Sequence, residues 1–143
     1  MDAYGFFVPA SERLKILGVI FASAIFPDRA PARFSLFSVR TGGARRPEMA
    51  SLPDQELTAL AHAELRGLLG LTAPPAFAHI ARHERGLPQY TLGHMDRVAA
   101  LGAGERRHPG LYFHGNAYHN AGVPELVSRS NQLALRLAEE LAR

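Results

Sequence analysis

The sequence predicts an α+β fold in which a mainly antiparallel sheet packs with helices. Strand-like sequence gathers in the first forty of the 143 residues, ahead of the first helical repeat, and does not alternate with helices. A short strand, a glycine-containing loop and a helix are expected to end the chain. Apolar residues make up 47% and charged residues 20%, which is typical of a folded domain of this length.

Three early segments are expected to form strands. Residues 5–8 end at Pro9, and residues 14–26 are rich in Ile, Val and Phe but long for one strand. Residues 34–39 alternate, with apolar side chains on both faces, and a Gly-Gly pair at 42–43 closes them. This pattern indicates burial on both sides, or one face turned toward a ligand.

Two helices show clear periodicity. The first begins at Ser51 or Pro53 and ends at Gly70, which suits a helix C-terminal cap. Its apolar positions recur at intervals of three and four residues: Leu57, Leu60, Ala61, Leu65, Leu68 and Leu69. The second begins at Pro124 with Glu125 in its first turn, where a carboxylate complements the helix dipole. Its apolar stripe contains Leu126, Val127, Leu133, Leu137 and Leu141.

The region between these helices is expected to hold three short elements. A strand at 77–82 follows the Pro-Pro pair at 74–75. A short helix at 94–101 leads into a glycine-rich turn, and residues 110–113 form a short strand of the buried type.

Composition excludes several classes of protein. The absence of cysteine excludes disulfides and thiolate metal sites. The longest apolar run, residues 16–26, is too short to span a bilayer, so we expect a cytoplasmic protein and leave peripheral membrane contact open. The net charge is +3, but the 16 Lys and Arg residues are scattered without interleaved aromatic residues. We therefore expect no nucleic-acid binding.

The most informative segment is residues 111–125. It is predicted to run from a strand through a loop with Gly115 and Gly122 into a helix N-terminus. Such a junction offers backbone N–H groups and the positive end of a helix dipole, and glycine lets a ligand approach the backbone closely. From these residues alone, an ordinary turn and a ligand-binding loop both stay open.

Several ordered stretches resemble the protoporphyrinogen oxidase family. Gly-Asn-Ala-Tyr at 115–118, followed by Gly-Val-Pro-Glu at 122–125, is similar to its C-terminal flavin motif. Gly-Phe-Phe-Val-Pro at 5–9 and Ile-Leu-Gly at 16–18 resemble the entry into its central substrate-domain sheet. Pro-Gln-Tyr-Thr-Leu-Gly-His at 88–94 is the most specific stretch. Together the matches cover essentially the whole chain.

The resemblance implies a function and a division of the chain. These enzymes use FAD to oxidise protoporphyrinogen to protoporphyrin in haem biosynthesis. Residues 1–90 would be part of a substrate-binding domain. Residues 91–143 would be the C-terminal part of an FAD-binding domain.

The resemblance also implies cofactor-binding residues. The backbone at Asn116 would face FAD near its pyrophosphate and ribityl chain. The backbone at Ala121, Gly122 and Val123 would lie along the pyrimidine edge of the flavin. An N–H group at a helix N-terminus stabilises charge that develops there on the reduced flavin.

The dinucleotide-binding fingerprint of such enzymes, G-x-G-x-x-G, does not occur in the 143 residues. We therefore expect a C-terminal segment that is incomplete and inactive alone, with weak or absent FAD binding. It would need an N-terminal FAD-domain partner chain or self-association.

An alternative is a non-catalytic, stand-alone module that binds a tetrapyrrole or a protein partner. Seven histidines make haem or metal binding worth weighing. However, His79 and His83 lie in strand-like sequence, where positions four apart do not converge, so no metal site is expected. No residue is indicated as catalytic. Phe34, Phe37 and Tyr90 would line a porphyrinogen-sized pocket or pack in a core, and core packing is favoured.

Overall fold

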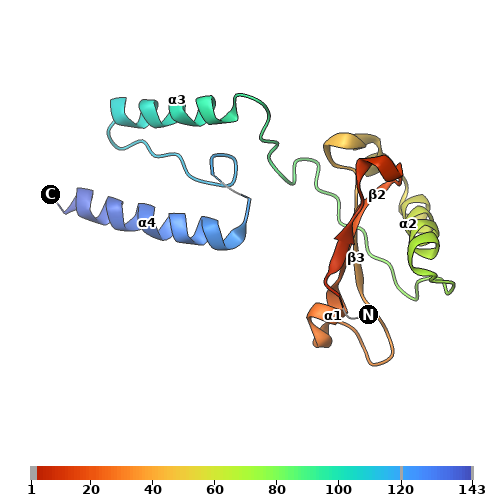
Figure 1. Cartoon of the computed structure of the whole chain (residues 1–143). Helices are drawn as coiled ribbons and strands as arrows, with labels where there is room; N and C mark the ends of the chain where they lie inside the picture. Colours follow the sequence, from red (N-terminus) through yellow and green to blue (C-terminus); the bar gives the residue numbers. More distant parts are fainter. Residues whose placement is uncertain (1–2, 120, 143) are drawn as a thin grey trace. The chain divides into compact units, whose positions relative to one another are not determined.

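The computed structural model describes residues 3–119 and 121–142 (Figure 1). The chain divides into two compact units, Met1–Glu84 and Arg85–Arg143. The first unit holds an antiparallel sheet with helices, and the second holds two long helices. The predicted α+β class is therefore confirmed. The assignment of residues 1–90 and 91–143 to two functional domains stays a prediction.

The sheet of the first unit has three strands in the order β1-β2-β3, with both pairs antiparallel. The strands are β1 (Gly5–Phe7), β2 (Ile16–Phe21) and β3 (Phe37–Thr41). β2 is shorter than the predicted segment because the chain turns into the helix α1 (Ala22–Ile25) after Phe21. β3 begins three residues later than predicted and ends two residues later, at Thr41, directly before the Gly-Gly pair.

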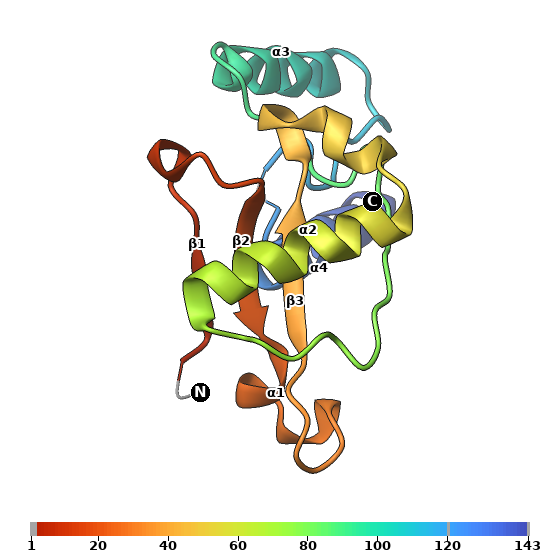
Figure 2. The same ribbon diagram turned by 90° about the vertical axis from the view of Figure 1, so that its right-hand side faces the viewer.

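The helix α2 (Asp54–Leu69) lies across one face of this sheet (Figure 2). The buried residues Ile16, Val19, Phe21 and Leu65 form the core between them. The Phe21 ring meets the Phe37 ring edge-to-face, with 5.6 Å between centroids. Burying a side chain of this size stabilises a fold by roughly 1.5–3 kcal/mol. The core therefore fixes which face of the sheet is covered.

Both predicted ends of α2 are confirmed. Pro53 is its N-cap residue, and Gly70 closes its C-terminus in the left-handed conformation at φ 69°. The Glu64 carboxylate accepts hydrogen bonds from the backbone N–H groups of Lys15 at 2.7 Å and Ile16 at 2.9 Å. These two bonds tie the middle of the helix to the start of β2.

The predicted strand at 77–82 is wrong. The structure shows no strand there. This segment is attached to the rest of the unit by the side chain of Arg82 and not by backbone hydrogen bonds to a neighbouring strand. The Arg82 guanidinium donates to the carbonyl oxygens of Ala50 at 2.9 Å and Leu52 at 2.6 Å. It also donates to the Asp54 carboxylate at 2.6 Å. Residue 82 is thereby held at the N-terminal end of α2.

The second unit consists of α3 (His94–Arg107) and α4 (Val123–Leu141), joined by an irregular segment (Figure 1). The prediction for α4 is confirmed, with Pro124 in its first turn. α3 extends six residues beyond its predicted end, so Gly102 and Gly104 lie inside a helix and the predicted glycine-rich turn is wrong. Glycine weakens a helix by about 1 kcal/mol per residue but does not by itself end one.

The predicted strand at 110–113 is also wrong. A strand needs a neighbour for its backbone groups, and the described part of the second unit contains no strand. The N–H group of Phe113 instead donates to the Glu105 carboxylate of α3 at 2.5 Å.

The two units differ in burial. All buried apolar residues of the described chain lie in the first unit: Ile16, Val19, Phe21, Met49, Leu57 and Leu65. In α4 the apolar side chains of Leu135 and Leu141 are 68% and 86% exposed. Within residues 3–119 and 121–142, every helix is too short or too polar to cross a lipid bilayer.

β1 and β2 approach each other closely at Gly18, which predicts a stability effect. A Cβ atom at Gly18 would lie 2.6 Å from the carbonyl oxygen of Phe6, so the strands would have to separate. We expect Gly18→Ala to destabilise the first unit by roughly 1–3 kcal/mol. Gly67→Ala in α2 is the matched control: a Cβ there meets nothing within 4 Å and should stabilise the helix by about 1 kcal/mol. Urea denaturation measures both, and equal effects would contradict the close approach.

Candidate functional site

The predicted flavin-binding residues lie on the segment between α3 and α4. Asn116 and Ala121 are exposed, Gly122 is the N-cap residue of α4, and Val123 is the first residue of that helix. The structure therefore places the last three at the start of α4 and Asn116 on the turn before it. Asn120, inside the predicted motif, lies outside the described residues.

The two glycines of this segment have different backbone conformations. Gly115 has φ 132°, a value that L side chains rarely adopt, so the turn itself requires glycine there. The N–H group of Tyr118 donates to the Gly115 carbonyl oxygen at 3.2 Å and closes this turn. Gly122 has φ −73° and ψ 125°, which any residue adopts. Backbone conformation therefore does not require glycine at 122.

The first turn of α4 begins directly at Gly122. The Gly122 carbonyl oxygen accepts a hydrogen bond from the Leu126 N–H group at 3.1 Å, and the positive end of the helix dipole lies at this residue. Glu125 in the first turn pairs with Arg129 at 2.7 Å. This end of the helix suits an electron-rich acceptor.

Side chains from α3 and from the residues before it hold the turn. The Tyr90 hydroxyl donates to the Asn116 carbonyl oxygen at 2.5 Å, and the Tyr90 ring packs on His94 with 4.6 Å between centroids. The ring of Phe113 lies 5.7 Å from that of Tyr118. These contacts fix the backbone of Asn116, although its side chain is exposed.

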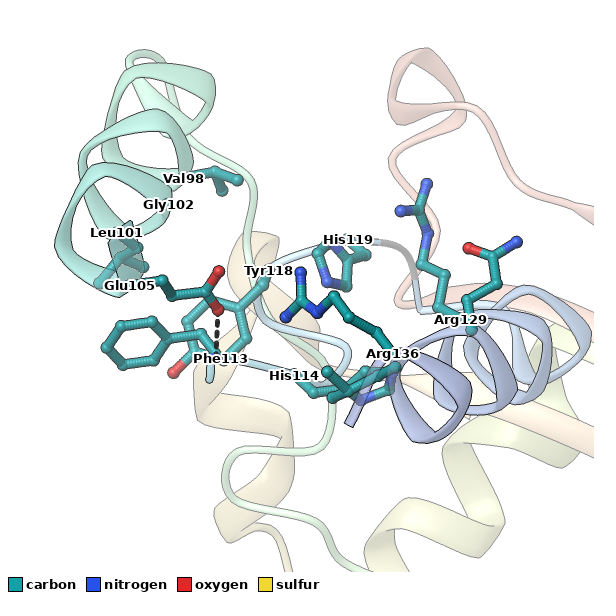
Figure 3. Close-up of a pocket in the computed structure, with 12 residues that line it drawn as sticks. Val98, Leu101, Gly102, Glu105, Phe113, His114, Tyr118, His119, Arg129 and Arg136 are labelled. Carbon is teal, nitrogen blue, oxygen red and sulfur yellow. Dashed lines mark hydrogen bonds between the residues drawn. The ribbon is translucent and has the colours of Figure 1, made fainter. Parts of the chain in front are cut away.

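A cavity of about 310 Å³ lies between α3, the connecting segment and α4 (Figure 3). Its volume is at the lower end of the range of small-molecule sites. Its walls combine apolar, aromatic and charged side chains, including Val98, Leu101, Phe113, Tyr118, Arg129 and Arg136.

The charges around this cavity are largely paired. Arg129 binds Glu125, and Arg136 lies 3.8 Å from Glu140. Glu105 accepts the hydrogen bond from the Phe113 N–H group. The cavity therefore shows no strong excess of one charge. Within the described residues, no three His, Asp or Glu side chains gather closely enough to hold a metal ion.

The two histidines that bracket the glycine loop come together in the structure. The rings of His114 and His119 lie 5.8 Å apart and nearly perpendicular, and His114 Nε2 lies 3.3 Å from the Ser130 hydroxyl of α4. Partial burial lowers the pKa of His119 below its ordinary value of 6.5, and the neighbouring Arg129 and His114 side chains lower it further.

A second exposed surface lies on the sheet. Val19 and Phe21 face the core, so alternation along β2 places Ile20 on the opposite face. Phe7, 86% exposed, and Arg40 share that face, since both pair with Gly18. The described first unit thus presents two apolar side chains and one cation on its open face.

The three aromatic residues considered for a pocket have different surroundings. Phe37 packs against the core, as favoured from the sequence. Phe34 is 59% exposed, so core packing is wrong for this residue because β3 begins only at Phe37. Tyr90, in the second unit, is 45% exposed and contacts the candidate loop, so core packing is wrong for this residue as well.

No signal in the sequence indicated several residues of the cavity and of the open sheet face. Glu105 and Arg136 line the cavity from the helices before and after the loop. Phe7 and Arg40 lie on separate strands of the sheet. No local spacing relates them. The motif at 88–94 did point to Tyr90, without indicating its contact with Asn116.

Comparison with known proteins identifies the class. The model of the flavin containing amine oxidoreductase family matches residues 2–127, which include the sheet, the loop and the first turn of α4. The chain belongs to this family, and a flavin is the cofactor that the family implies.

The relatives narrow the comparison. The chain is 32% identical over 126 residues to the mitochondrial protoporphyrinogen oxidase of Nicotiana tabacum, which covers 86% of this chain and 25% of that protein. It is 31% identical over 121 residues to coproporphyrinogen III oxidase of Propionibacterium freudenreichii, covering 83% and 23%. It is 28% identical over 144 residues to protoporphyrinogen oxidase of Bos taurus, covering 96% and 30%. The chain thus spans about a quarter of the length of these curated relatives. The predicted resemblance to a segment of a protoporphyrinogen oxidase is confirmed.

The pKa of His119 gives a prediction for this site. We expect its imidazole to titrate below pH 6.5, and Arg129→Gln to raise its pKa only in part, because burial is the larger cause. Because folding lowers the pKa of His119, this group contributes its full stabilisation at pH values above the ordinary pKa of 6.5. That stability is lost as the pH falls from about 6.5 through the lowered pKa.

Proton NMR titration of the imidazole checks this prediction. Arg136→Gln is the matched control, since Arg136 lines the same cavity but is not among the groups that shift His119. A His119 pKa at or above 6.5 in the unaltered chain would contradict the burial seen here.

Proposed function

We propose that this chain supplies the flavin-edge loop and part of the substrate-facing sheet of a protoporphyrinogen oxidase-like flavoprotein. The assembled protein would oxidise protoporphyrinogen to protoporphyrin with FAD, in the cytoplasm. The observation that carries the proposal is the family match over residues 2–127, in which the exposed loop leads into the N-terminus of α4. The names of the relatives point to porphyrinogens as the substrate class.

The loop residues fit the edge of a flavin. Ala121, Gly122 and Val123 are exposed, and they lie where the positive end of the α4 dipole begins. A flavin bound with its pyrimidine edge here would have negative charge on that edge stabilised by the helix dipole. The backbone of Asn116, held by Tyr90, would lie near the pyrophosphate and ribityl chain.

The open face of the sheet fits the substrate class. Phe7 and Ile20 offer apolar contact to a macrocycle, and Arg40 on the same face offers a guanidinium to its carboxylate side chains. This face therefore supports porphyrinogen binding more directly than Phe37, which packs in the core.

The flavoprotein needs a further portion to hold the rest of FAD. No G-x-G-x-x-G sequence occurs in the 143 residues, so the fingerprint would lie on another portion of the same polypeptide or on a partner chain. The exposed apolar side chains of α4, such as Leu135 and Leu141, offer it a surface. Self-association is the other way to cover them.

The absence of the fingerprint from these residues leads to a binding prediction. We expect the purified 143-residue chain to be colourless and to bind FAD no more tightly than about micromolar, near −8 kcal/mol. The loop alone would contact one edge of the cofactor and leave most of it in solvent. Titration of FAD fluorescence measures the affinity. Isolation of the chain with stoichiometric yellow flavin would refute the expectation.

A substitution at Gly122 tests the flavin role of the loop. In the protein assembled with a dinucleotide-binding portion, we expect Gly122→Val to abolish oxidation of protoporphyrinogen, because the side chain would block the flavin edge. Valine is a poor N-cap residue, so we expect a loss of about 1 kcal/mol of stability, but the chain should still fold because φ −73° accommodates valine and the residue is exposed.

Gly122→Ala and a melting curve control for backbone effects. Turnover that is unchanged in the Gly122→Val protein would exclude the role assigned to this loop. If the chain is instead a stand-alone, non-catalytic module, Gly122→Val should leave its binding of a tetrapyrrole or a protein partner unaltered.

A further inference from the structure

We infer that Tyr90 is a positioning residue, which sets the place of the flavin-edge loop through the backbone of Asn116. The inference rests on the proposed function, since it takes residues 116–123 as the loop that receives the flavin. Tyr90 acts through the loop and does not itself touch the cofactor.

The contact between the two residues is direct and short. The Tyr90 hydroxyl donates to the Asn116 carbonyl oxygen at 2.5 Å, across 26 positions of the chain. Asn116 follows Gly115, whose φ of 132° turns the chain sharply. A hydrogen bond placed directly after this turn restrains the direction in which the backbone leaves it.

The position of Tyr90 is restrained by contacts with the first turn of α3. Its ring packs on the His94 ring, with 4.6 Å between centroids and 35° between planes. The His94 N–H group donates to the Thr91 carbonyl oxygen at 3.0 Å. The Arg97 guanidinium binds the Thr91 hydroxyl at 2.9 Å and the Leu92 carbonyl oxygen at 3.2 Å. The residues around Tyr90 are therefore bound to the first turn of α3.

The same helix holds the connecting segment at a second point. Glu105, near the other end of α3, accepts the hydrogen bond from the Phe113 N–H group at 2.5 Å. Residue 113 is thus attached to α3 near its C-terminal end, and residue 116 is attached to Tyr90, whose ring packs on His94 at the N-terminal end of α3. Two attachment points restrain both the position and the direction of the segment between them.

These two side-chain hydrogen bonds give the backbone of the segment the partners that a neighbouring strand would otherwise provide. Within the described second unit no strand lies beside residues 110–116, so side chains replace the backbone ladder. Removing the Tyr90 hydroxyl should therefore free the turn without removing the ring that packs on His94.

The first test is hydrogen exchange of the unaltered and substituted 143-residue chains without flavin. Tyr90→Phe should speed exchange in residues 115–119 about fivefold, the loss expected for one hydrogen bond. Tyr112→Phe is the matched control. It removes a phenol that donates to Glu140 and leaves Asn116 untouched. Unchanged exchange in Tyr90→Phe, or an equal increase in Tyr112→Phe, would overturn the inference.

The second test uses the protein assembled with a dinucleotide-binding portion, with FAD as the probe. Tyr90→Phe should raise the Kd for FAD about fivefold and shift the absorption of the bound flavin, with an unchanged melting temperature. Tyr112→Phe should change neither. Faster exchange with unaltered FAD affinity would overturn the inference.

The two proposals fail in different ways. If Tyr90→Phe leaves exchange and FAD affinity unchanged while Gly122→Val abolishes turnover, the positioning role is lost and the proposed function stands. If Gly122→Val leaves turnover unchanged, the proposed function is lost whatever Tyr90 does.

Discussion

The candidate site depends on one constraint: the segment proposed to receive the flavin has no neighbouring strand within the described second unit, so side chains of α3 and of the residues before it hold its backbone. Glu105 binds the backbone at Phe113, and Tyr90 binds it at Asn116. Because backbone polar groups need partners, these two contacts decide where the chain runs before it enters α4.

In the first unit, backbone groups are paired between strands and not held by side chains alone. The strands hydrogen-bond to one another, and α2 covers one face of the sheet through Leu65. Glu64 accepts two hydrogen bonds from the start of β2. A helix on one face leaves the other face open, with Phe7 and Arg40 exposed there. A self-sufficient core is thus combined with an open surface in this unit. The described second unit, in contrast, combines a formed loop with helices that bury no side chain.

This contrast matches the division of work in a flavin enzyme. The flavin supplies the redox chemistry, while the protein positions it and excludes competing reactions. In the proposed flavoprotein, the sheet presents a surface to the substrate and the loop presents N–H groups and a helix dipole to the cofactor. The apolar surface of α4 would then be covered by the portion that binds the rest of FAD, which would couple the order of the second unit to assembly.

The sequence by itself determined the features that depend on neighbours along the chain. Apolar spacing predicted α2 and α4, Gly70 predicted the end of α2, and the motifs around Gly122 predicted the loop and the family. Tertiary structure decided whether an extended segment becomes a strand, because pairing needs a partner from elsewhere. Residues 77–82 and 110–113 have strand-like sequence but pair with no strand among residues 3–119 and 121–142. The same physical reason hid the bond from Tyr90 to Asn116: the two residues are 26 positions apart, and only folding brings them together.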